Sequence, residues 1–134
     1  MHQPPPPAQV TAWARTYPGR PDQIPQARAQ IRQLLADYAI ADDVILCVSE
    51  LASNAVLHSN SRSPGGSFTV RVTLRPGDHV LIEVEDDGGP WAPKPGNPDR
   101  GHGLDILRAL ASSWGLNGDR HSRIIWARFD WSTQ

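Results

Sequence analysis

The sequence predicts an α+β fold, a two-layer α/β sandwich whose mainly antiparallel mixed sheet carries helices on one face. Segments with helical spacing of apolar residues and segments with alternating spacing follow one another as strand, two helices, hairpin, long loop, helix and strands. The chain has 134 residues, of which 39% are hydrophobic, and this is enough for one domain with one core. We therefore expect residues 9–134 to form a single domain.

The first segments of the chain are a proline run, a strand and a helix. Residues 1–8 include four consecutive prolines, which cannot build a hydrogen-bonded element, so we expect a disordered proline-rich arm. Alternating residues over 9–15 predict a strand, stopped by a Tyr-Pro-Gly sequence and expected at an edge of the sheet. Residues 25–38 have the apolar spacing of a helix, and Pro25 suits its first turn.

A second helix is predicted after a short break near Ala41, and it carries an unusual polar stripe. Its apolar face extends to Ala55. At about 100° per residue, Glu50, Asn54 and His58 fall together on the shoulder of that face. These three side chains are therefore expected to line a crevice beside the core.

The second half of the chain predicts a hairpin, a loop, a helix and closing strands. Alternation over 68–74 and 80–85, with Pro-Gly-Asp between them, favours a hairpin. Residues 86–101 lose all periodicity, and so long a loop in a compact chain is usually functional or disordered. A third helix is predicted over 103–112, and the last strand over 123–130.

The composition excludes several classes of function. Charged residues are 20% of the chain and the formal net charge is -1, so broad electrostatic binding to nucleic acid is not expected. No stretch approaches the roughly 18 apolar residues of a membrane span and no signal segment is present, so we expect a cytoplasmic protein without a membrane partner. The single cysteine, Cys47, lies in an apolar run, which favours a buried inert thiol.

Two groups of polar residues are each open to a plain and a functional interpretation. Glu50 and Asn54 carry a penalty in an apolar helix, because a half-buried Glu needs a partner, yet a solvated polar stripe is the simpler account of that pair alone. Asp86 and Gly88 follow an apolar strand, where Asp and Gly favour a turn. An ionised Asp there can equally accept a hydrogen bond from an exocyclic amine such as that of adenine, while Gly88 admits close approach of the base.

A third group, Arg-Gly-His-Gly-Leu at 100–104, directly precedes the third helix. Gly101 and Gly103 expose N–H groups at a helix N-terminus, where a phosphate is favoured, and Arg100 could add a charge-assisted contact. A plain helix start with a solvated arginine accounts for the same residues. The group does not directly follow a strand, so it is neither a dinucleotide fingerprint nor a Walker P-loop.

Together and in this order, the three groups resemble the N, G1 and G2 boxes of the Bergerat-fold ATPases, the superfamily of histidine-kinase, gyrase and MutL ATP-binding domains. The resemblance covers residues 10–129. Within the superfamily, the Ser-Glu-Leu sequence at 49–51, Asn54, His58 and the Ile-Trp-Ala sequence at 125–127 are most similar to stand-alone anti-sigma-factor serine/threonine kinases.

The resemblance implies a role for each box. Asn54 would ligate Mg²⁺ through its side-chain oxygen, and Glu50 would be the general base for the attacking hydroxyl or water. Asp86 would bind the adenine amino group, and Gly88 would form the floor of the base pocket. The phosphates of ATP would be bound by the residues before and at the start of the third helix, namely Arg100, Gly101, His102, Gly103 and Leu104.

Two positions depart from the family pattern. Pro90 stands where the G1 box has its second glycine, which stiffens the first hinge of the lid. The last strand of the family brings a threonine near the adenine-binding Asp, where this sequence offers Ile124 with Ser122 nearby.

The function implied by the resemblance is that of an ATP-binding kinase which, with Mg²⁺, phosphorylates an antagonist protein in a partner-switching pathway. The expected partners are a sigma factor, an anti-anti-sigma antagonist protein or both, and a homodimer is compatible with the resemblance. The alternative is a non-catalytic module whose affinity for a sigma factor or another partner responds to nucleotide. Pro90 and Ile124 motivate that alternative.

Overall fold

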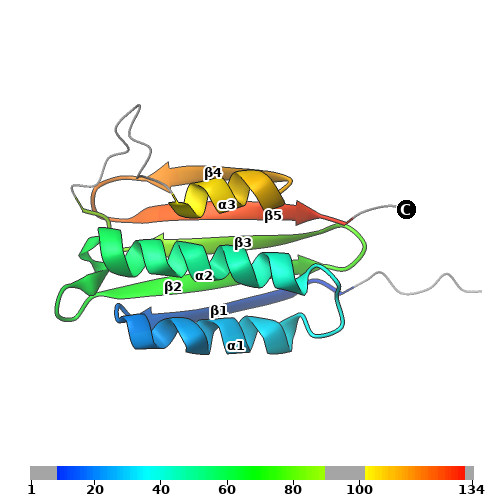
Figure 1. The fold of residues 1–134 in the computed structure, drawn as a ribbon, viewed down its shortest axis with the longest axis horizontal. Helices are drawn as coiled ribbons and strands as arrows, with labels where there is room; N and C mark the ends of the chain where they lie inside the picture. Colours follow the sequence, from blue (N-terminus) through cyan, green and yellow to red (C-terminus); the bar gives the residue numbers. More distant parts are fainter. Residues whose placement is uncertain (1–8, 90–101, 132–134) are drawn as a thin grey trace, which may run out of the picture.

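The computed structural model describes residues 9–89 and 102–131, with residues 102 and 103 described by their backbone alone. It contains a five-stranded sheet in the order β1-β2-β3-β5-β4, in which every neighbouring pair is antiparallel. Among the described residues, three α-helices cover one face of this sheet (Figure 1). The α+β fold with helices on one face, predicted from the sequence, is confirmed.

The elements follow the predicted order. The strands are β1 Thr11–Pro18, β2 Ser67–Arg75, β3 His79–Asp86, β4 Ser113–Gly118 and β5 Arg123–Asp130. The α-helices are α1 Ile24–Leu34, α2 Ala41–His58 and α3 His102–Leu110, with short 3-10 turns η1 Pro21–Gln23 and η2 Asn60–Arg62. No described helix is long and apolar enough to cross a membrane.

Two element ends differ from the predicted bounds because of contacts that are distant in sequence. β1 lies at an edge as predicted, but it continues to Pro18 because Tyr17 pairs with Phe68 of β2 and their rings stack at 5.3 Å. α1 ends at Leu34 rather than at residue 38. Tyr38 lies beyond the helix and packs edge-on against the Trp131 ring at 5.2 Å, a contact that a continued helix would have to rearrange.

The core lies between the sheet and the helices, and strict alternation builds it. Every second residue of β2, β3 and β5 is buried, so one face of the sheet is apolar and packs against the helices. The helical side is dominated by α2, whose buried residues are Ala41, Val44, Ile45, Cys47, Val48, Leu51, Ala52, Ala55 and Val56. This core fixes α2 over the middle of the sheet and thereby positions its polar stripe.

One end of the molecule gathers the segments that the sequence analysis singled out. The C-terminal end of α2, the C-terminal end of β3, the start of β5 and the first turn of α3 all lie at the left in Figure 1. They are far apart in the chain, and the antiparallel order of the sheet together with the direction of the helices brings them together.

Candidate functional site

The second half of α2 carries the predicted polar stripe. Glu50 and Asn54 are half-buried, and His58 is exposed at the last position of the helix. Leu51 and Ala55 are buried beside them and fix the rotation of the helix. Among the described residues, no hydrogen bond or ion pair holds the side chain of Glu50 or Asn54. Half-buried polar groups without a protein partner are satisfied by water or a ligand, so both side chains are suited to binding.

Asp86 ends β3 on the inner face of the sheet, with a side chain that is only 3% exposed. Its Oδ1 accepts a hydrogen bond from the Gly88 amide at 2.7 Å. Arg123 of β5 lies directly opposite, with its Nε 3.3 Å from Oδ1 and its Nη2 3.5 Å from Oδ2. Burial raises the pKa of Asp86, and the Gly88 amide and the Arg123 guanidinium oppose this effect.

Two hydrogen bonds tie the end of α2 to the segment that follows β3. The Asn60 amide donates to the Gly88 carbonyl at 2.7 Å, and the Asp87 amide donates to the Ser61 hydroxyl at 3.0 Å. Asn60 and Ser61 belong to η2, which follows α2 directly. The turn that follows the predicted N-box helix and the predicted G1 segment are therefore held next to each other by one backbone–backbone and one backbone–side-chain hydrogen bond.

Gly88 occupies a position that only glycine suits. Its φ is +71°, and a Cβ added there would lie 2.2 Å from the carbonyl oxygen of Arg120, in the turn before β5. The glycine thus allows the end of β3 to pass close to that turn. Its role as the floor of a base pocket stays a prediction.

Replacing Gly88 by Ala should lower the free energy of unfolding by about 2–4 kcal/mol, because a strained backbone and a steric clash with Arg120 add together. Urea unfolding followed by tryptophan fluorescence measures this loss. Gly77→Ala is the matched control, since Gly77 has φ +82° but nothing within 4 Å of the added Cβ. Its cost should be about 1 kcal/mol from the backbone alone. Equal costs for the two variants would contradict the close approach at Gly88.

The predicted phosphate-binding residues are only partly described. Arg100 and Gly101 lie outside the described residues, as does Pro90. His102 and Gly103 form the first turn of α3, and Leu104 after them is half-buried and packs against the core. α3 packs beside α2, which places its N-terminal end at the same end of the sheet as Asp86 (Figure 1).

In β5 the residue that faces Asp86 is Arg123, and not Ile124 or Ser122 as expected from the sequence. Ile124 pairs with Glu85 in the register, so it lies on the outer face of the sheet. Ser122 is on that face too, where its hydroxyl donates to a Glu85 carboxylate oxygen at 2.6 Å. Arg123, which the sequence analysis missed, faces Asp86. Counting back in steps of two from the apolar inner positions of β5 would have found it.

Comparison with known families matches residues 17–129 to the histidine kinase-like ATPase domain. This stretch includes α2, the end of β3 and α3. The chain belongs to this family. The membership predicted from the N, G1 and G2 boxes is therefore confirmed. Among curated proteins, the search finds no match.

Two solved structures share the fold of this histidine kinase-like ATPase domain. The crystal structure of the RsbU and RsbW domains of Rv1364c from Mycobacterium tuberculosis has a TM-score of 0.71 at 21% identity, and the match covers 89% of this chain and 32% of that one. The crystal structure of the SiaB-SiaC complex from Pseudomonas aeruginosa has a TM-score of 0.56 at 14% identity, and the match covers 87% of this chain and 88% of that one. At these identities the likeness shows the fold alone.

The family implies binding of ATP, and the described residues of this ATPase domain fit that ligand. Asn54 offers a half-buried carboxamide oxygen, a ligand type that suits Mg²⁺. Asp86 offers a carboxylate that can accept a hydrogen bond from a base. The hydrogen bond from Asn60 to Gly88 holds the C-terminal end of α2, which carries Asn54, next to the end of β3, which carries Asp86.

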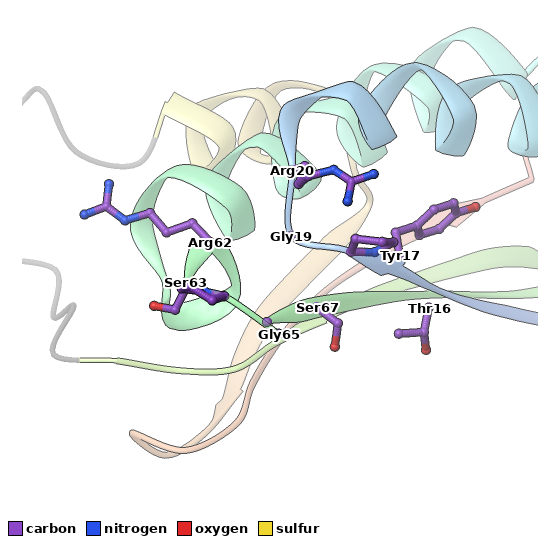
Figure 2. A pocket seen from close by; sticks show the side chains of 11 residues that line it. Thr16, Tyr17, Gly19, Arg20, Arg62, Ser63, Gly65 and Ser67 are labelled. Atoms are coloured by element: carbon purple, nitrogen blue, oxygen red, sulfur yellow. The ribbon is translucent and has the colours of Figure 1, made fainter.

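A cleft of about 630 Å³ lies at the same end of the sheet but outside this group of residues. It is formed where β1 leads into η1 and where the loop after η2 leads into β2 (Figure 2). Tyr17, Arg20, Arg62 and Ser67 contribute to its walls. Glu50, Asn54 and Asp86 do not line it.

Proposed function

We propose that the chain binds ATP with Mg²⁺ at the end of the sheet where α2 and β3 meet. The observation that carries the proposal is the hydrogen bond from Asn60 to Gly88, which joins the turn after the helix of Asn54 to the segment after the strand of Asp86 in a member of the histidine kinase-like ATPase domain family. Asn54 would bind the metal ion, and Asp86 would accept a hydrogen bond from the adenine amino group.

The phosphates would be bound by backbone donors at the N-terminal end of α3. A helix N-terminus presents N–H groups and a favourable dipole to an anion. His102, Gly103 and Leu104 form the first turn there. Arg100 and Gly101, which precede that turn in the sequence, would complete this part of the site.

We infer further that the nucleotide is used in catalysis, with Glu50 as the general base. Bound Mg²⁺-ATP supplies the phosphoryl group. Glu50 lies one helical turn before Asn54 on the same side of α2. No described cation pairs with its carboxylate, so the carboxylate can accept a proton from an attacking serine or threonine hydroxyl or from water.

The proposed acceptor is an antagonist protein of a partner-switching pathway. The shared fold with an RsbW domain and with SiaB, whose structure was solved in a complex with SiaC, supports a protein partner of this kind. We also propose a sigma factor as a second partner, a homodimer, a location in the cytoplasm, and one ATP-binding domain over residues 9–134.

A non-catalytic, nucleotide-responsive binding module is the second candidate function. The buried ion pair between Arg123 and Asp86 engages the carboxylate assigned to adenine and so weakens nucleotide binding, which suits a module that responds to the nucleotide level better than a kinase. Under this alternative the chain sequesters a sigma factor or another partner, and nucleotide changes its affinity for that partner. ATP would bind, turnover would be absent, and partner binding would survive the loss of Glu50.

Adding ATP or ADP with Mg²⁺ should raise the melting temperature of the chain by several degrees. A ligand present at about one hundred times its dissociation constant adds ~2.7 kcal/mol to the free energy of unfolding. For a domain of this size, that gain corresponds to a rise of several degrees in the melting temperature. Thermal denaturation with and without Mg²⁺ measures the effect. An unchanged melting temperature with both nucleotides would remove both candidate functions.

Variants separate the roles within the same measurement. Asn54→Ala should lose the Mg²⁺-dependent part of the shift, whereas Ser53→Ala, its neighbour on α2, should keep all of it. Asp86→Asn should lose the shift with every adenine nucleotide, because an amide oxygen is a weaker acceptor than a carboxylate and its amino group repels the adenine amine. A full shift in Asp86→Asn would overturn the assignment of Asp86.

A further inference from the structure

Arg123 and Asp86 form an ion pair that is closed off from solvent. The Arg123 side chain is 8% exposed, and the two residues are directly opposite in the antiparallel register of β3 and β5. Both lie on the inner face of the sheet, under the helices. The guanidinium therefore rests on the carboxylate that the proposed function assigns to the base.

The contacts of Asp86 leave little room for a further donor. A carboxylate has about four positions that accept hydrogen bonds. The Gly88 amide takes one on Oδ1, and Arg123 takes another on Oδ1 and one on Oδ2. Arg123 Nη2 also lies 3.4 Å from the His58 carbonyl oxygen at the end of α2. One acceptor position stays open on Oδ2, and an adenine amine that used it would lie against the guanidinium that bonds the same oxygen.

The pair is buried but its geometry is loose. Its N···O distances of 3.3 and 3.5 Å exceed the roughly 2.7–2.9 Å of a strong charge-assisted hydrogen bond. On the outer face of the same sheet, Arg71 Nη2 is 2.6 Å from a Glu85 oxygen, although that pair is far more exposed. The contact between Arg123 and Asp86 is thus longer than that of a strong ion pair, so the guanidinium can move away from the carboxylate at a smaller cost.

We propose that Arg123 belongs to the base site and sets its affinity, by holding the Asp86 carboxylate until the exocyclic amine of an adenine nucleotide replaces it. This inference rests on the proposed role of Asp86. Only the molecules in which the guanidinium has moved away can bind the base, so the apparent dissociation constant is raised in inverse proportion to their fraction.

Arg123→Thr tests the proposal by isothermal titration calorimetry with Mg²⁺-ADP. Threonine suits a strand, and its hydroxyl can still donate to Asp86, but it leaves the space of the guanidinium open. The variant should bind ADP at least about tenfold more tightly than the parent chain. Its affinity for Mg²⁺-tripolyphosphate, which has no base, should stay the same. Arg71→Thr, which removes an arginine–carboxylate pair from the opposite face, should leave ADP affinity unchanged.

The outcomes separate this inference from the proposed function. If the parent binds ADP and Arg123→Thr binds it equally or more weakly, Arg123 does not set the affinity, and nucleotide binding stands. If Arg123→Thr gains as much affinity for tripolyphosphate as for ADP, the inference is also overturned, because tripolyphosphate has no base and the gain must arise elsewhere in the site. Binding of ADP by neither protein would overturn both. If Arg123→Thr does not fold by circular dichroism, Arg123→Gln, which is neutral and close in length, replaces it with the same expected direction.

Discussion

Replacing Glu50 by Gln should slow ATP turnover by orders of magnitude and leave ATP affinity unchanged. The amide has the shape of the carboxylate but cannot take a proton, and the loss of a general base lowers a rate by about 10²–10⁴-fold. Asn54 and Asp86, which would bind the metal ion and the adenine, are untouched. Phosphate release and transfer to a candidate antagonist protein measure the rate, and calorimetry with Mg²⁺-ATP measures the affinity.

Asp43→Asn is the matched control for this experiment. Asp43 lies seven residues before Glu50 on α2, so both carboxylates are on the same side of the helix. Burial raises the pKa of Cys47 to about 12, and the negative charges of Asp43 and Glu50 add to this effect, which places both near the same thiol. An equal loss of turnover in both variants would mean that helix charge matters rather than a base. A parent chain that binds ATP without turnover would favour the non-catalytic module.

The elements of the fold were predictable because their patterns are local. β2 and β3 alternate without a break, and α2 keeps its apolar spacing over five turns. The ends of β1 and α1 were not predictable in the same way. They depend on the stacking of Tyr17 on Phe68 and on the packing of Tyr38 against Trp131, which join residues distant in sequence.

The candidate site shows the same division between local and distant information. The positions of Asn54 on α2 and of Asp86 at the end of β3 follow from periodicity alone. The partner of Asp86 depends on the register between β3 and β5, and a shift by one residue exchanges the two faces of a strand. For this reason Ile124 was named from the sequence, whereas Arg123 is the residue that the register places opposite Asp86.

Asp86→Ala should lower the free energy of unfolding by about 3–5 kcal/mol, because it leaves the Arg123 guanidinium buried without its carboxylate. Urea unfolding measures the loss. Glu85→Ala is the matched control on the next residue of β3. Glu85 is 31% exposed and pairs with Arg71 on the outer face, so its removal should cost less than about 1 kcal/mol. Similar costs for the two variants would contradict the buried environment of Asp86.

Removing both partners should reverse that loss. Burial outweighs the Gly88 amide and Arg123 in setting the pKa of Asp86, so the folded-state pKa lies above the unfolded-state one. A carboxyl group of this kind stabilises the fold below its unfolded-state pKa and loses that contribution as the pH rises through the folded-state pKa. Above the folded-state pKa the ionised Asp86 carboxyl therefore contributes no net stability.

The combined variant Asp86→Leu with Arg123→Met should be as stable as the parent chain or up to about 4 kcal/mol more stable, since apolar side chains can replace a buried ion pair without penalty. It should bind no adenine nucleotide. If the double variant is instead as unstable as Asp86→Ala, the fold itself requires the ion pair. If stability is regained while nucleotide binding is lost, the fold does not require the pair, and Asp86 is the member of the pair that nucleotide binding requires.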